Sequence, residues 1–83
     1  DAANRRHIRR HGLTEEQVEQ VLTDPLAIDG GMEIVDGEER YITIGATEGG
    51  RLFAVVHSER NGRIHPVTVF RASVQQRHRY QEG

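Results

Sequence analysis

Hydrophobic residues near the N-terminus recur at the spacing of an α-helix. Val18, Val21 and Leu22 fall on one helical face. A capping box at residues 14–17 (Thr-Glu-Glu-Gln) precedes them, and in such a box the first and fourth side chains each accept the other residue's backbone N–H. Pro25 disfavours helical backbone at the residue before it. We therefore expect one amphipathic helix that begins after residue 14 and ends near residue 24.

The pattern then changes to the alternation and β-branched clustering of strands. Asn61-Gly62 favours a type I′ hairpin turn. The segment 26–35 is predicted to form either a weak strand or a hairpin broken at Gly30-Gly31. The segments with strand character are 26–35, 40–46, 51–58 and 64–71.

Two further helices are expected at the ends of the chain. Residues 2–10 form the first, closed by Gly12, and a second capping box at residues 73–76 starts the last, which has only Val74 and Tyr80 to pack. The fold class is therefore α+β, with two N-terminal helices, an antiparallel meander of three to four strands and a C-terminal helix. It is a single domain over 1–83. One face of the sheet must pack against the hydrophobic stripe of Val18, Val21 and Leu22. We expect a ligand to bind on the opposite face of the sheet.

The Asn61-Gly62 turn sets an expected register for the last hairpin. If Arg60 lies opposite Arg63, then His57 lies opposite Pro66. Two opposed arginines repel unless solvent or an anion lies between them. The hairpin tip is therefore either solvated or an anion site. The same count pairs Ser58 with His65, Val56 with Val67, and Leu52 with Arg71.

The basic residues are distributed unevenly. All eleven are Arg, four of them in residues 4–12 and seven from Arg40 onward, whereas residues 13–39 hold nine acidic residues and no basic one. Arg holds phosphate with two parallel bonds, so this usage suits a phosphate-binding protein. An Arg bias is also typical of GC-rich coding sequence, and the N-terminal cluster could pair instead with the acidic segment.

Other classes of protein are disfavoured by composition. The chain has no Cys, so neither disulfides nor a thiolate zinc site is available. No apolar run is long enough for a membrane span, and no signal peptide is visible, so we expect a cytoplasmic protein with no membrane partner. His7 and His11 share a helical face, but the arginines around them would repel a cation, and no metal or cofactor is expected.

Four segments resemble the BrnT family of toxins. They are HGLTEEQVEQVLTDPLAI, GEERYITIG, GRLFAVVHSERNGRI and RASVQQRHRY, and together they cover nearly all of the chain. The resemblance implies a fold similar to RelE-type ribonuclease toxins and an endoribonuclease activity in a type II toxin–antitoxin pair. It also implies an RNA substrate and a ribbon-helix-helix antitoxin, with operator DNA bound only through the antitoxin complex.

The chain departs from the family pattern in two places. Family members usually begin with a strand that carries Trp-Asp, and this strand is absent here; a sheet edge left bare by its loss could pair with another chain, for example in a homodimer. Family members also usually carry Arg immediately before the position of Arg71, where this chain has Phe70. This substitution motivates an alternative, a catalytically inactive module that binds RNA or antitoxin. A third hypothesis is an obligate assembly protein.

Metal-independent RNA cleavage needs a base for the 2′-hydroxyl, an acid for the leaving oxygen and cations around the phosphate. Imidazole suits the proton transfers, and His57 and His65 are its candidates on the last hairpin. His57 could equally be a half-buried strand residue. For His65 we expect a structural role and not a catalytic one. The expected catalytic residues are His57, Arg71 and Arg51; the expected substrate-binding residues are Arg60, Arg63, Arg77, Arg79 and Tyr80, of which the last could instead only pack.

Overall fold

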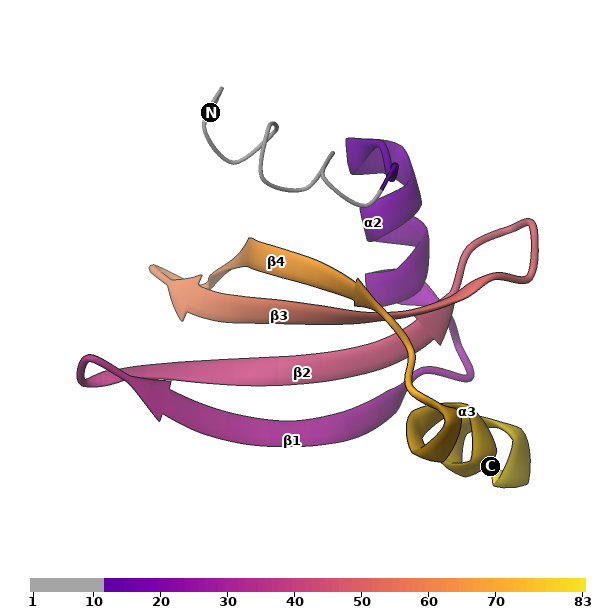
Figure 1. The fold of residues 1–83 in the computed structure, drawn as a ribbon. Helices are drawn as coiled ribbons and strands as arrows, with labels where there is room; N and C mark the ends of the chain where they lie inside the picture. The colour runs from indigo at the N-terminus through magenta and orange to yellow at the C-terminus, as the bar shows by residue number, and fades with distance from the viewer. Residues whose placement is uncertain (1–11) are drawn as a thin grey trace.

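The computed structural model describes residues 12–83 and has an α+β fold (Figure 1). Its four strands form one antiparallel sheet in the order β1-β2-β3-β4. Along the chain, one described helix precedes the strands and one follows them. The expected helix over residues 2–10 lies outside the described residues, so the described part has one N-terminal helix and not two. The elements are α2 (Glu15–Thr23), β1 (Ile28–Val35), β2 (Glu38–Ala46), β3 (Leu52–Arg60), β4 (Arg63–Arg71) and α3 (Val74–Glu82).

Helix α2 begins and ends where its sequence predicts. The Thr14 side chain accepts a bond from the Gln17 amide, and the Gln17 side chain accepts one from the Thr14 amide. Asp24 is the C-cap, and Pro25 follows it. The capping box is thus confirmed, and it satisfies two N–H groups that a helix end otherwise leaves without a partner.

Segment 28–35 forms one bulged strand and not a hairpin. The register of β1 against β2 shifts between Asp29 and Gly31, and β1 continues on both sides of the shift. A Cβ at Gly30 would lie 2.7 Å from Ile42 Cγ2, so the missing side chain of Gly30 lets β1 approach β2 closely. The turn lies instead at Asp36-Gly37, where both residues have positive φ, as a type I′ turn requires.

The β3–β4 hairpin confirms the expected turn but corrects half of the expected register. Asn61 and Gly62 have φ of 53° and 75°, and Arg60 pairs with Arg63. Beyond His57–Pro66 the register shifts by one residue, so that Val56 pairs with Thr68 and Phe53 with Arg71. The expected pairs Val56–Val67 and Leu52–Arg71 are therefore wrong. Pro66 cannot donate to the ladder, and the irregularity falls beside it.

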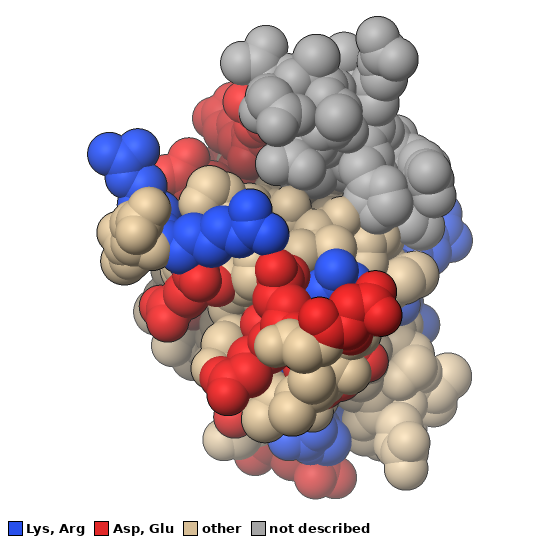
Figure 2. All heavy atoms as spheres, turned by 90° about the vertical axis from the view of Figure 1, so that its left-hand side faces the viewer, with Lys and Arg blue, Asp and Glu red and all other residues tan. Residues whose placement is uncertain are grey.

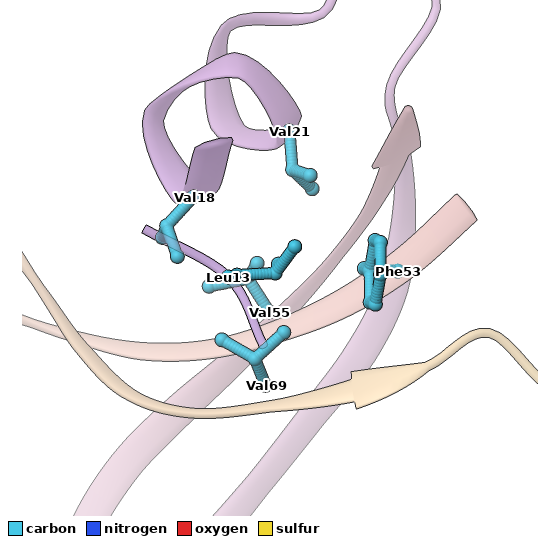
Figure 3. Packing of buried hydrophobic residues seen from close by; sticks show 6 residues of the cluster. All are labelled: Leu13, Val18, Val21, Phe53, Val55 and Val69. Atoms are coloured by element: carbon cyan, nitrogen blue, oxygen red, sulfur yellow. The ribbon is translucent and has the colours of Figure 1, made fainter. Parts of the chain in front are cut away.

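The core lies between α2 and the β2–β4 part of the sheet. Figure 3 shows Val18 and Val21 of α2 directed toward the sheet residues Phe53, Val55 and Val69, with Leu13 between them. All six side chains are at most 2% exposed, and burial of each contributes about 1.5–3 kcal/mol. Helix and sheet approach so closely that a Cβ at Gly45 would lie 2.5 Å from the Val21 carbonyl oxygen. This close contact between Gly45 and Val21 fixes the position of α2 on β2.

Candidate anion-binding site

A pocket of about 590 Å³ lies where the ends of β3 and β4 meet α3. Its walls come from the loop before β3, from the chain between β4 and α3, and from one face of α3. The pocket is at an end of the sheet, and not on an open sheet face as the sequence led us to expect. The residues that line it are Gly50, Arg51, Leu52, Phe53, Arg71, Ala72, Val74, Arg77, His78 and Gln81.

The strand pairing brings Arg51 and Arg71 together. Arg71 pairs with Phe53, two residues after Arg51, and the Arg51 guanidinium lies over the Phe53 ring at 5.2 Å from its centroid. The amide of Ala72 donates to the carbonyl of Leu52 at 3.1 Å, which extends the pairing past the end of β4. Both arginines therefore project from a well-bonded part of the sheet.

A tight turn holds the loop before β3. The Thr47 amide donates to the Arg51 carbonyl at 3.0 Å, and the Gly50 amide donates to the Thr47 carbonyl at 2.9 Å. The buried Thr47 hydroxyl also accepts from the Arg51 amide at 3.3 Å. These bonds anchor the backbone of Arg51 while its side chain stays exposed.

Helix α3 supplies the opposite wall. Its capping box is complete, because Ser73 and Gln76 each accept the other residue's amide. The lining residues of α3 are spaced i, i+3, i+4 and i+7, which puts them on one helical face. They are Val74, Arg77, His78 and Gln81.

The pocket is strongly cationic. Three arginines (Arg51, Arg71 and Arg77) and His78 line it, and no Asp or Glu is among the ten lining residues in the described part of the chain. Among the described residues, none of these three guanidinium groups takes part in an ion pair. A cluster of unneutralised guanidinium groups with a concave shape binds an anion, and phosphate suits their paired donors.

The structure does not bring His57 to this pocket. His57 lies four residues along β3 from Phe53, about 13 Å at ~3.3 Å per residue. It is only 8% exposed, and a 2.8 Å hydrogen bond joins its Nε2 to Thr43 Oγ1. Burial lowers the pKa of His57, partly opposed by the nearby Glu59 carboxylate. A buried, neutral imidazole at this position is suited to a role in packing.

Arg60 and Arg63 lie at the other end of the sheet. Arg60 forms a 2.9 Å ion pair with Glu38, whose other oxygen lies 3.3 Å from Arg40 Nε. The hydrogen bonds from Arg60 and then Arg40 lower the pKa of Glu38. Figure 2 shows acidic side chains gathered at this end with basic ones beside them. Arg63 is exposed at the hairpin tip.

Arg79 and Tyr80 contact the protein itself. The Arg79 guanidinium donates to the carbonyl of Asp29 at 2.9 Å, and the Tyr80 hydroxyl donates to Asp24 Oδ2 at 2.6 Å. Neither residue lines the pocket. Of the eight expected site residues, the structure therefore assembles Arg51, Arg71 and Arg77 in one place.

His78 is the pocket residue that the sequence analysis missed. A signal was present, because His78 follows Val74 by four residues and precedes Gln81 by three, on the same face as Arg77. The polar character of α3 concealed it, since no hydrophobic stripe marks which face meets the sheet. Strand pairing gives positions for histidines on the hairpin, whereas it gives none for a histidine on α3.

The described residues show neither a metal-binding cluster nor a membrane-spanning helix. Within 12–83 there is no group of three or more His, Asp or Glu side chains that could hold a metal ion. Neither described helix has the length and apolar character needed to cross a bilayer. The pair His7 and His11 lies outside the described residues.

The fold and the pocket indicate the class of protein. It is a small α+β protein with a cationic pocket that is suited to a phosphate-bearing ligand. The family model for BrnT, the ribonuclease toxin of type II toxin–antitoxin systems, matches residues 1–76. The chain therefore belongs to the BrnT family, and the resemblance stated from its sequence is confirmed. Membership implies an antitoxin partner and an RNA substrate. A comparison with curated proteins finds no match.

Proposed function

We propose that this protein is an endoribonuclease toxin that cleaves RNA without a metal ion, in the pocket between the strand ends and α3. Family membership supports RNA as the substrate, and one observation supports this pocket as the site of cleavage. Arg51, Arg71, Arg77 and His78 line it together, and no carboxylate of residues 12–83 lines it with them. We expect the scissile phosphate to lie among the three guanidinium groups.

The proposed reaction is attack by the ribose 2′-oxygen on the adjacent phosphorus. A 2′O–P bond forms, the P–O5′ bond breaks, and the products carry a 2′,3′-cyclic phosphate and a 5′-hydroxyl. His78 takes the proton of the 2′-hydroxyl, because imidazole exchanges protons near neutral pH. The arginines stabilise the charge that develops on the phosphorane, and the leaving oxygen takes a proton from water.

This proposal moves the proton-transfer role from His57 to His78 and keeps Arg51 and Arg71 at the phosphate. Arg77 joins them as a substrate-binding residue. Arg60 and Arg63 stay candidates for contact with the RNA strand beyond the pocket, because Arg63 is exposed at the hairpin tip. Arg79 and Tyr80 hold α3 through their hydrogen bonds to the Asp29 carbonyl and the Asp24 carboxylate.

The partners proposed for the toxin follow its family. They are a ribbon-helix-helix antitoxin that neutralises it and operator DNA bound only through the antitoxin complex. We also propose a cytoplasmic location and, for the chain alone, a homodimer. Co-purification with the product of the adjacent gene and light scattering test the antitoxin and the dimer respectively.

The test of the activity is cleavage of an end-labelled RNA with a metal chelator present. Arg71→Gln should lower kcat/KM about 100-fold or more, the usual effect of removing one charge-stabilising donor, and His78→Gln should lower it by about 10²–10⁴. His65→Gln and Arg40→Gln are matched controls outside the pocket and should cut like wild type. Cleavage that survives both pocket substitutions, or that stops on chelation, contradicts the proposal.

A second candidate function is RNA or antitoxin binding without turnover. Phe70 motivates it, because the family resemblance leads us to expect Arg there. Phe70 pairs with Ala54 and is 51% exposed, so it lies on the opposite sheet face from its neighbour Arg71. Tight binding of a labelled RNA, with no cyclic-phosphate product and no growth arrest on expression, would favour this function over cleavage.

A further inference from the structure

Helix α3 is held against the sheet with little hydrophobic packing. None of its nine residues is buried, and Val74, its aliphatic residue, is 69% exposed. An isolated helix of this length is marginal in water. Polar contacts must therefore supply much of the free energy that docks α3, and with it the pocket wall that carries Arg77 and His78.

One carboxylate joins three parts of the chain at the base of α3. Asp24 caps the end of α2, and its Oδ2 accepts both the Ala46 amide at 2.8 Å and the Tyr80 hydroxyl at 2.6 Å. Its Oδ1 accepts the Leu26 amide at 2.9 Å. The bond to Tyr80 is therefore anchored to the ends of both α2 and β2.

A second contact lies on the neighbouring residue of α3. The Arg79 guanidinium donates to the carbonyl of Asp29, at the bulge of β1, at 2.9 Å. Arg79 and Tyr80 follow Arg77 and His78 directly in sequence. Consecutive helical residues lie about 100° apart around the axis, since a turn holds 3.6 residues. The side of α3 that grips the sheet and the side that lines the pocket are thus adjacent.

We propose that Tyr80 and Arg79 are positioning residues of the ribonuclease site. Two hydrogen bonds, from Tyr80 to Asp24 and from Arg79 to the Asp29 carbonyl, form what we call the clasp. The clasp holds α3 in the orientation that places Arg77 and His78 in the pocket with the two strand-end arginines. The inference rests on the proposed function, because it assigns the clasp a role in binding RNA. It replaces direct RNA contact, which is the role expected of Arg79 from the sequence and one of the two roles left open for Tyr80.

The clasp predicts a particular kinetic signature. In Tyr80→Phe the ring remains but the bond to Asp24 is lost, so that α3 is docked in only a fraction of the free molecules. RNA that binds the arginines of the docked state selects that state, so KM rises as the competent fraction falls, while kcat at saturation is preserved. A KM increase of roughly tenfold corresponds to the loss of one hydrogen bond to a charged group.

The experiment combines steady-state cleavage of a short RNA with amide hydrogen exchange of the free protein. For Tyr80→Phe and, independently, Arg79→Gln, we expect α3 amides to exchange about tenfold faster, β3 amides to be unchanged and KM to rise with kcat within about twofold. Tyr41→Phe is the matched control, because it removes another tyrosine–carboxylate bond, to Glu39, away from the pocket. It should leave all three quantities unchanged.

Each other outcome overturns the inference. A higher KM with unchanged α3 exchange means that Tyr80 or Arg79 contacts RNA directly. A lower kcat with unchanged KM means that the substitution reduces the amount of folded enzyme. Unchanged exchange and kinetics mean that the clasp has no role. If wild-type protein neither binds nor cuts RNA, the proposed function fails, whereas the exchange measurement still reports whether the clasp docks α3.

Discussion

Arg71 lies directly opposite Phe53 in the β3–β4 pairing, and the Phe53 ring also carries the Arg51 guanidinium at 5.2 Å. The register shift beside Pro66 produces this arrangement. Without the shift, Arg71 would pair with Leu52, whose side chain points to the other face of the sheet. The position of Arg71 opposite Phe53, on the same sheet face as Arg51, thus depends on one extra residue in β4.

The first prediction concerns the charge that each pocket arginine contributes to RNA binding. In Arg71→Gln, affinity for an RNA made uncleavable by a 2′-O-methyl group should fall, and its salt dependence should weaken. The slope of log K against log salt should decrease in magnitude by about 0.7, the value for one phosphate contact to a single strand. A binding titration at several salt concentrations measures it.

Arg40→Gln is the control for this prediction. Arg40 is paired with Glu38 and lies outside the pocket, so its slope should match wild type. An unchanged slope for Arg71→Gln would mean that Arg71 does not contact a phosphate. If Arg63→Gln also lowers the slope, the RNA extends to the hairpin tip, as the sequence analysis expects.

Local signals account for most of what could be predicted from the sequence. The capping boxes at Thr14 and Ser73 and the turn at Asn61-Gly62 depend on bonds between neighbours in sequence, and all are confirmed. The pairing of Arg71 could not be found in this way, because a bulge shifts every later pair. His78 was missed for a related reason, since α3 docks through polar bonds between residues far apart in sequence, such as Tyr80 and Asp24.

The second prediction concerns the buried imidazole of His57. Burial lowers its pKa in the folded state below the ordinary value of about 6.5, so the unfolded state binds more protons just below that value. The free energy of unfolding should therefore fall as pH drops through 6.5 toward the lowered pKa. In His57→Gln, which keeps a polar partner for Thr43, this pH dependence should be lost. Urea unfolding between pH 5 and 8 measures it.

The control for His57 is His65→Gln, a more exposed histidine on β4. It should retain the wild-type dependence. The carboxylates Asp24 and Glu38 also have lowered pKa values, from ordinary values of 3.8 and 4.5. Their stabilisation is lost as pH falls through those ordinary values, so it contributes little to the slope between pH 6 and 7. A His57→Gln protein with the wild-type slope above pH 5 would show that His57 is not the group responsible.

The third prediction tests the close contact between α2 and β2. In Gly45→Ala the new Cβ would meet the Val21 carbonyl oxygen at 2.5 Å, and backbone cannot rotate away as a side chain can. We expect a loss of about 1–3 kcal/mol in the free energy of unfolding, as for other overpacked sites. Gly49→Ala is the matched control, because its Cβ would have its nearest neighbour at 3.8 Å. Equal stability of the two variants in urea would mean that α2 shifts freely on the sheet.

The fourth prediction concerns the phenol of Tyr80. The hydrogen bond to Asp24, with burial and the charge of that carboxylate, raises the pKa of Tyr80 above 10.0. Because the folded value is the higher one, the stabilisation is present below the unfolded pKa and is lost as pH rises through the folded value. The hydrogen bond to Glu39 likewise raises the pKa of Tyr41, the second tyrosine of the chain. The titration is therefore made in Tyr41→Phe, where Tyr80 is the one remaining phenol. In that background Asp24→Asn should lower the midpoint of phenolate absorbance toward 10. An unchanged midpoint would show that Tyr80 and Asp24 are not bonded in solution, and α3 would then need another anchor.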